Sequence, residues 1–167
     1  MNKRLYWLLA VCGLVILLTT QEGQSKQIVG WLENIRLSPE GLLIRAKVDT
    51  GAKTASLSAE EIKEFTHNGQ NWIRFKVTNR RGETATFERP IYRMAKIKRH
   101  FERSQKRPVV LIGICMGGIH KQTEVNLIDR TGFNYQMLIG RTFLQGDFMI
   151  DPALKHTVSP QCEEAHQ

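Results

Sequence analysis

One aspartate stands where a carboxylate could do chemistry. Asp49 comes directly after the apolar, alternating run at residues 42–48, and Thr50 and Gly51 follow it at once. A carboxylate on such a tight loop can accept hydrogen bonds from neighbouring backbone N–H groups and hydroxyls, which fix the direction of its oxygens. The same three residues also suit an ordinary Asx-type turn, so this segment alone predicts either a catalytic carboxylate or a structural turn.

A second segment, further along the chain, favours the catalytic interpretation. Residues 137–144 read as an apolar strand that ends in Gly-Arg and leads into a short helix, downstream of a candidate flap hairpin. In this order the two segments closely resemble the retropepsin-like aspartic proteases. Residues 49–52 match the active-site loop of that family, and residues 138–141 match the hydrophobic-hydrophobic-glycine motif that supports the loop.

More narrowly, the chain resembles a bacterial family that carries the label ATP-dependent zinc protease and is commonly regarded as retropepsin-like. The resemblance spans roughly residues 28–155, which is most of the chain that follows the apolar N-terminal run. The segments that carry it are 47–54, 88–90, 107–110 and 138–152.

The resemblance implies a pair of aspartates that activates water. One carboxylate draws a proton from the water while the other gives one to the peptide carbonyl, and the two share a proton. Because the sequence has a single Asp-Thr-Gly, a symmetric homodimer is implied in which each subunit supplies Asp49. Thr50 would brace the loop across the two-fold axis, and Gly51 would allow close backbone approach. The implied supporting residues are Ala52, Ile139, Gly140 and Arg141.

A monomer could instead take its second carboxylate from another aspartate. Asp129 sits where a strand gives way to a turn, and Asp151 precedes a proline. Structural roles suit both positions better than catalytic ones.

Neither zinc nor ATP finds support in the residues. Zinc hydrolysis needs about three protein ligands, commonly with two histidines four apart on a helix, whereas the 5 histidines here are scattered. A P-loop would end in Gly-Lys-Ser or Gly-Lys-Thr, and the glycines at 113–118 lack that lysine. We therefore expect no metal site and no cofactor.

The elements that would position Asp49 are predicted to be mainly β. Alternation at period 2 and turn residues predict hairpins at 28–48, 72–87 and 109–128. Helical pattern is limited to short stretches near 59–65 and 141–145, so we expect one or two short helices. Many short strands in one domain suggest a closed or sandwich-like barrel. The resemblance narrows this to a retropepsin-like closed β-barrel in which the hairpin at 72–87 is flap-like.

Basic residues gather on and after the predicted flap. Its tip carries Arg80, Arg81 and Gly82, a single glycine where viral flaps are glycine-rich, and the segment from Arg89 to Arg107 is crowded with lysine and arginine. A solvated basic loop is one interpretation. The other is a rim that steers acidic substrate to the cleft; relatives linked with glutamate-ligase systems make a glutamate-rich peptide the expected substrate. The candidate substrate-binding residues are Arg80, Arg81, Gly82 and Arg89.

Length and charge limit the class of protein. A chain of 167 residues has room for one domain and excludes a large multidomain enzyme. The formal net charge of +8 favours anionic partners. Nucleic acid ranks below peptide, because export removes the usual target and no recognition helix or aromatic platform is evident.

The N-terminus indicates export. Lys3 and Arg4 precede an uncharged, almost wholly apolar run at 5–18, which is typical of a signal peptide and short for a membrane span. The small-residue cleavage pattern is weak, so an uncleaved inner-membrane anchor is the alternative, and either way we expect a periplasmic location. The predicted divisions are an export segment at 1–20, a linker at 21–26, the protease domain at 27–158 and a polar tail at 159–167.

An oxidising compartment would permit a disulfide between Cys115 and Cys162, but two cysteines so placed do not predict one.

Our leading hypothesis is an exported, homodimeric, metal-independent aspartic endopeptidase. The alternative is a non-catalytic periplasmic module that kept the barrel and binds acidic peptides or polymers on its basic surface.

Overall fold

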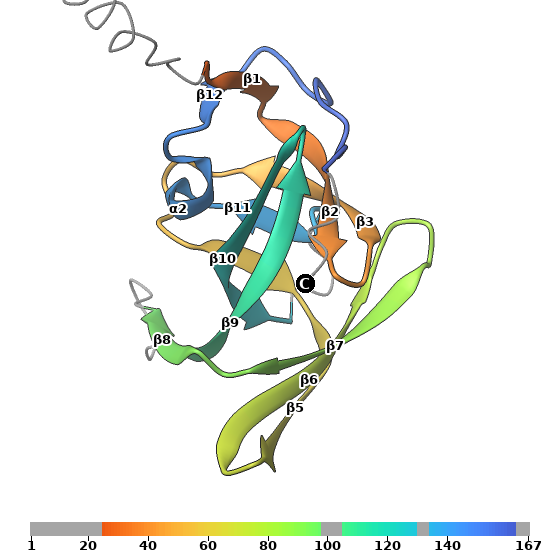
Figure 1. The fold of residues 1–167 in the computed structure, drawn as a ribbon, viewed down its shortest axis with the longest axis vertical. Helices are drawn as coiled ribbons and strands as arrows, with labels where there is room; N and C mark the ends of the chain where they lie inside the picture. Colours follow the sequence, from red (N-terminus) through yellow and green to blue (C-terminus); the bar gives the residue numbers. More distant parts are fainter. Residues whose placement is uncertain (1–24, 98–104, 130–133, 163–167) are drawn as a thin grey trace, which may run out of the picture.

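The computed structural model describes residues 25–97, 105–129 and 134–162 (Figure 1). It is mainly β, with 63% strand and 3% helix, as predicted. The first strands are β1 (Gln27–Gly30), β2 (Leu32–Ser38), β3 (Leu42–Val48), β4 (Ala55–Ser58), β5 (Glu60–His67), β6 (Gln70–Thr78) and β7 (Thr84–Pro90). They are followed by β8 (Arg93–Ile97), β9 (Gln105–Met116), β10 (Ile119–Ile128), β11 (Met137–Ile139), the helix α2 (Arg141–Leu144) and β12 (Phe148–Asp151).

Six strands close into a barrel, which confirms the predicted fold class. The order is β10-β4-β11-β3-β2-β9, and β9 returns to pair with β10. The short strand β11 lies between β3 and β4, parallel to the first and antiparallel to the second. The strand that leads into the Asp49 loop and the strand that leaves it are therefore both held by β11.

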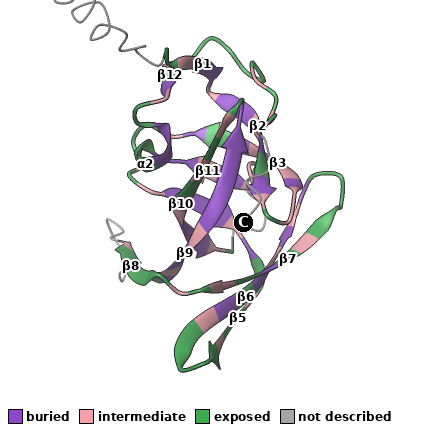
Figure 2. Cartoon of the chain, viewed as in Figure 1, coloured by how far each residue is buried: buried purple, intermediate pink, exposed green. Residues whose placement is uncertain are grey.

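Alternation along β3 shows why this sequence makes a barrel wall. Its even-numbered residues, from Leu42 to Val48, are buried in the core, and its odd-numbered residues face outward. Successive strand side chains point to opposite faces, so a period-2 sequence presents one apolar face to the interior. Figure 2 shows the same division between buried and exposed residues across the barrel.

Strands β5, β6 and β7 form a separate three-stranded sheet below the barrel (Figure 1). The prediction of a helical turn near residues 59–65 was wrong, because this stretch belongs to the strand β5, which pairs with β6 from Glu60 to His67. A bulge between Glu60 and Lys63, with Glu61 at φ 49°, interrupts the ladder. Pairing with a neighbouring strand outweighed the weak helical pattern.

Residues 152–162 follow β12 and form a C-terminal strap that is attached to the barrel at two places. Buried Glu33 Oε1 accepts hydrogen bonds from Gly30 N at 2.7 Å, Thr157 N at 3.1 Å and Thr157 Oγ1 at 2.5 Å. Further along, Cys115 and Cys162 form a disulfide with their Cα atoms 5.9 Å apart, a pairing that the sequence left open.

Replacing Glu33 by alanine is expected to lower the free energy of unfolding by roughly 2–4 kcal/mol, because the buried Gly30 N and the partly buried donors of Thr157 lose their acceptor. Urea denaturation followed by circular dichroism measures the change. Glu64→Ala on the exposed face of β5 is the matched control, with an expected change below about 0.5 kcal/mol. Equal stability of the two variants would mean that Glu33 does not hold the strap.

The predicted export segment at 1–20 and most of the linker lie outside the described residues, as do residues 163–167 of the tail. Within the described ranges, no helix combines the length and the apolar character that a membrane crossing requires.

Candidate active site

The barrel places Asp49 at the end of β3. Its backbone N donates to Ile139 O at 2.9 Å, directly after the parallel pair Ile139 and Val48. The strand β11 therefore extends its ladder to the aspartate itself, and the backbone of Asp49 is fixed by the strand that directly precedes Gly140.

The carboxylate is held by its own loop. Asp49 Oδ1 accepts hydrogen bonds from Gly51 N at 3.0 Å and Ala52 N at 3.2 Å, and Ala52 N also lies 3.2 Å from Asp49 O. Asp49 is half-buried, whereas Thr50 and Gly51 are exposed. The bonds from backbone N–H groups fix the direction of the carboxylate.

Residues from α2 hold the loop from behind. Arg141 N donates to Ala52 O at 2.9 Å, and Arg141 Nη1 donates to Thr50 O at 2.8 Å and to Gly51 O at 2.9 Å. These bonds join segments 90 positions apart in the sequence. The arginine thus satisfies carbonyl groups that an exposed loop would otherwise leave to water.

Thr142 is a supporting residue that the sequence analysis missed. Its N and Oγ1 both donate to Lys53 O, at 3.0 and 2.8 Å. Its place directly after the Gly-Arg pair is the signal that could have identified it. Together, the residues at 140–142 contact each peptide unit from Thr50 to Lys53.

Gly140 is required by the close approach of two backbones. A Cβ atom there would lie 2.7 Å from Lys53 O and 2.7 Å from both the carbonyl carbon and oxygen of Thr54. Real Cβ atoms do not come so close to backbone, so a side chain would push the loop away from β11.

The two other aspartates considered as a second carboxylate, Asp129 and Asp151, are not brought to Asp49 within one chain. Asp129 follows Ile128, which pairs with Ser58 at the far end of β4 from the loop. Asp151 lies in the β1–β12 pair, and its Oδ1 accepts a hydrogen bond from Ala153 N at 2.9 Å. Asp151 therefore closes a turn.

The predicted flap is a hairpin of β6 and β7, and its tip is organised by Asn79. Asn79 Oδ1 accepts from Arg81 N at 2.9 Å and Glu83 N at 3.0 Å, while Nδ2 donates to Leu43 O at 3.0 Å. Leu43 is at the opposite end of β3 from Asp49. The structure therefore does not bring the tip residues Arg80, Arg81 and Gly82 to the aspartate of the same chain.

Arg89 makes a structural contact. Its Nη2 donates to Glu40 Oε1 at 2.6 Å, with both side chains largely buried, and its guanidinium lies 5.5 Å from the centre of the Phe87 ring. This ion pair fastens β7 to the turn between β2 and β3. Contact of Arg89 with substrate stays a prediction.

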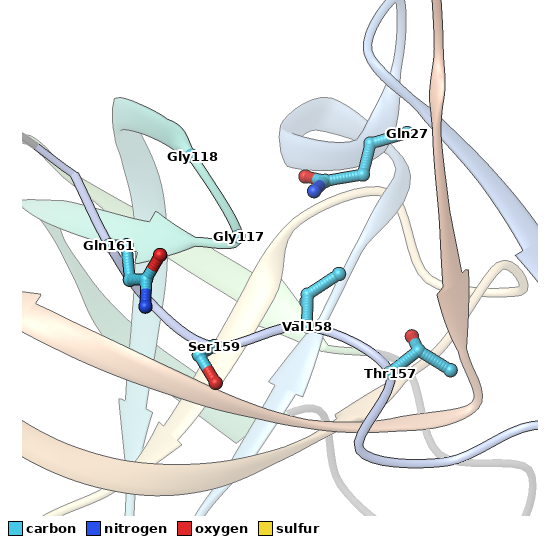
Figure 3. A pocket seen from close by; sticks show the side chains of 7 residues that line it. All are labelled: Gln27, Gly117, Gly118, Thr157, Val158, Ser159 and Gln161. Carbon is cyan, nitrogen blue, oxygen red and sulfur yellow. The ribbon is translucent and has the colours of Figure 1, made fainter.

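Two features of the described ranges bear on ligands. No group of three or more His, Cys, Asp or Glu side chains is placed to hold a metal ion. A pocket of about 360 Å³ lies beside the C-terminal strap (Figure 3), lined by Gln27, Gly117, Gly118, Thr157, Val158, Ser159 and Gln161. None of the predicted site residues lines it, and none of its side chains is titratable.

Comparison with known proteins agrees with this geometry. Residues 28–161 match the RimB-like family, described as the retropepsin-like aspartic endopeptidase RimB. A crystal structure of a protein of unknown function from Legionella pneumophila superposes with a TM-score of 0.71 at 37% identity, covering 81% of this chain and 100% of that one.

Curated relatives are longer proteins. A protein named probable alpha-L-glutamate ligase from Desulfotalea psychrophila is 30% identical over 145 residues, 84% of this chain and 31% of the relative. One of the same name from Shewanella pealeana is 32% identical over 113 residues, 66% of this chain and 25% of the relative. The chain thus spans about a quarter to a third of the relatives that it matches.

These matches confirm the family resemblance that the two sequence motifs predicted. The Asp-Thr-Gly loop, the Gly-Arg segment behind it and the closed barrel that joins them all lie within the matched residues. The chain belongs to the RimB-like family of retropepsin-like aspartic endopeptidases.

Proposed function

We propose that the protein is an aspartic endopeptidase whose active form is a homodimer, with one Asp49 from each subunit. The observation that carries this proposal is the held carboxylate: Asp49 Oδ1 accepts two backbone N–H bonds on a loop that Arg141 fastens from behind. The exposed Thr50 and Gly51 leave the loop accessible to a second copy.

The proposed reaction adds water across a peptide bond. One carboxylate takes a proton from the water as its oxygen attacks the carbonyl carbon, and the second carboxylic acid gives its proton to the carbonyl oxygen. The tetrahedral intermediate then collapses: one of its hydroxyls returns a proton to the ionised carboxylate, the C–N bond breaks, and the amine leaves with a proton from the other carboxyl group. Two carboxylates about 3 Å apart cannot both ionise cheaply, so the pair retains the shared proton that this chemistry needs.

Acidic, glutamate-rich peptides are the proposed substrates. The net charge of +8 favours an anionic partner. The curated relatives are named as probable glutamate ligases, and a peptidase for glutamate-rich chains is the hydrolytic counterpart of an enzyme that adds glutamate.

A periplasmic location, with the N-terminal segment as signal or anchor, is part of the proposal. The basic residues ahead of the apolar run support it. The Cys115–Cys162 disulfide also supports it, because such bonds persist in oxidising compartments.

Subunit mixing tests the dimer. The full chain is expected to cleave glutamate-rich peptides, with or without chelator, at a specific activity that rises with protein concentration. Subunit exchange with excess Asp49→Asn protein should inactivate the wild type, because a mixed dimer has only one Asp49. A nine-fold excess leaves roughly a tenth of the original wild-type dimers, and therefore roughly a tenth of the activity.

The control for mixing is Lys63→Gln, a change on the exposed face of β5, whose addition should raise the total activity. The dimer would be contradicted if excess Asp49→Asn protein left the wild-type activity unchanged and if activity were proportional to protein concentration over the whole range. Failure of the wild type to cleave any peptide of a mixed pool, with retained binding of acidic peptides, would replace the peptidase by a binding module.

A further inference from the structure

The face of β3 that carries Asp49 also carries an exposed cation. Ile44, Ala46 and Val48 are buried, so alternation turns Lys47 outward, and the bond from Asp49 N to Ile139 O continues the extended pattern to the aspartate. Lys47 and Asp49 therefore project from the same face, with Cα atoms about 6–7 Å apart for two strand residues.

Lys47 is exposed, and within the described part of the chain its ammonium has no ion-pair or hydrogen-bond partner. Other cations near the predicted flap differ from it. Arg89 is paired with Glu40 and Arg93 with Glu124. The charge of Lys47 is thus available to a ligand at the aspartate.

An aliphatic side chain lies directly beside this lysine. Leu138 is the register partner of Lys47 across the parallel β11–β3 ladder, and of Ser56 across the antiparallel β11–β4 ladder. Leu138 is half-buried, whereas its neighbours Met137 and Ile139 are fully buried in the core. The row next to Asp49 therefore offers an ammonium and a partly open aliphatic surface, about 4.8 Å apart from strand to strand, whereas Ser56 is buried.

We infer that Lys47 determines specificity at the subsite beside the scissile bond, where Leu138 packs on the aliphatic stem of a substrate side chain and Lys47 pairs with its carboxylate. A glutamate side chain has this combination of stem and charge. The inference rests on the proposed function, because a subsite beside Asp49 matters only if Asp49 hydrolyses the peptide.

The competing explanation is that Lys47 is a solvated surface lysine. A lone exposed charge pair contributes little in water, but a peptide lying over the sheet displaces water and strengthens the attraction. Selectivity between glutamate and glutamine separates the two explanations, since these side chains have nearly the same shape and differ in charge.

The test measures kcat/KM of the full chain, purified in detergent, on peptide pairs that carry Glu or Gln at each position around the cleaved bond. We expect the wild type to prefer Glu about ten-fold at one adjacent position. Lys47→Gln should lower this preference at least five-fold, and Lys47→Arg should keep it. Lys47→Glu should reverse the charge preference, so that a peptide with lysine at that position becomes the better substrate. Arg45→Gln is the matched control, one step further along the same face, and should change the ratio less than two-fold.

An unchanged Glu-to-Gln ratio in Lys47→Gln, with wild-type cleavage intact, would overturn the inference and leave the proposed function standing. An equal loss of preference in Arg45→Gln would also overturn it, because the effect would then come from general surface charge. Cleavage that survives Asp49→Asn would defeat the proposed function itself, whatever the Lys47 variants do.

Discussion

Asp49→Asn is expected to lower kcat/KM for peptide hydrolysis at least 10³-fold, at the upper end of the effect of general acid–base catalysis. In a homodimer this one substitution removes both carboxylates, and an amide can neither take a proton from water nor give one to the carbonyl. The fold should survive, because the asparagine Oδ1 can still accept the bonds from Gly51 N and Ala52 N that Asp49 accepts. Initial rates on a peptide pool, beside circular dichroism, measure both effects.

Asp151→Asn is the matched control for this change. Asp151 closes a turn through Ala153 N, a bond that asparagine can also accept, so activity should stay within about two-fold of the wild type. Chelator should leave the wild-type rate unchanged. If Asp49→Asn were active and Asp151→Asn were not, the assignment of the reacting carboxylate would be wrong.

Local patterns were enough to predict the parts of the fold that depend on neighbours in sequence. Alternation along residues 42–48 and the turn residues before them predicted the hairpin of β2 and β3, and the continuous apolar run at 109–116 predicted β9. The first prediction rests on the period-2 rule and turn chemistry, and the second on an uninterrupted apolar run that ends at a glycine turn; all of these signals act within a few residues.

Contacts between distant segments could not be predicted in this way. The insertion of β11 between β3 and β4, and the bonds from Arg141 to the Asp49 loop, join residues about 90 positions apart. Here the family resemblance supplied the association that local pattern lacks. The disulfide was left open for the same reason, since only the path of the strap brings Cys162 to Cys115.

The predicted flap shows the limit of the resemblance. A hairpin forms at 72–87 as expected, but the amide of Asn79 anchors its tip to Leu43, and β5 joins it as a third strand. One long-range hydrogen bond and one added strand direct the hairpin away from the aspartate of its own chain. Neither has a signature in the local sequence.

The support behind the loop makes a second strong prediction. Gly140 has φ −89° and ψ 173°, an extended conformation that alanine adopts freely, so Gly140→Ala introduces no backbone strain. The added Cβ would nevertheless lie 2.7 Å from backbone atoms of Lys53 and Thr54, none of which is the end of a flexible side chain. The residues at 53–54 must move, and they carry the loop of Asp49 with them.

Two measurements follow from this displacement. Overpacking of this kind is expected to cost about 1–3 kcal/mol of stability in urea denaturation. A misplacement of about 1 Å at a reacting group is expected to lower kcat about 10²-fold, a larger effect than the lost stability would cause at temperatures where the variant stays folded.

The matched control is Gly118→Ala in the turn between β9 and β10. A Cβ atom at Gly118 would meet no atom within 4 Å, so both stability and activity should stay near wild type. If Gly140→Ala were as active as Gly118→Ala, the loop would not depend on close contact with β11. Loss of activity in a folded Gly140→Ala variant, with Asp49 intact, would instead show that hydrolysis depends on the position of the loop as well as on its carboxylate.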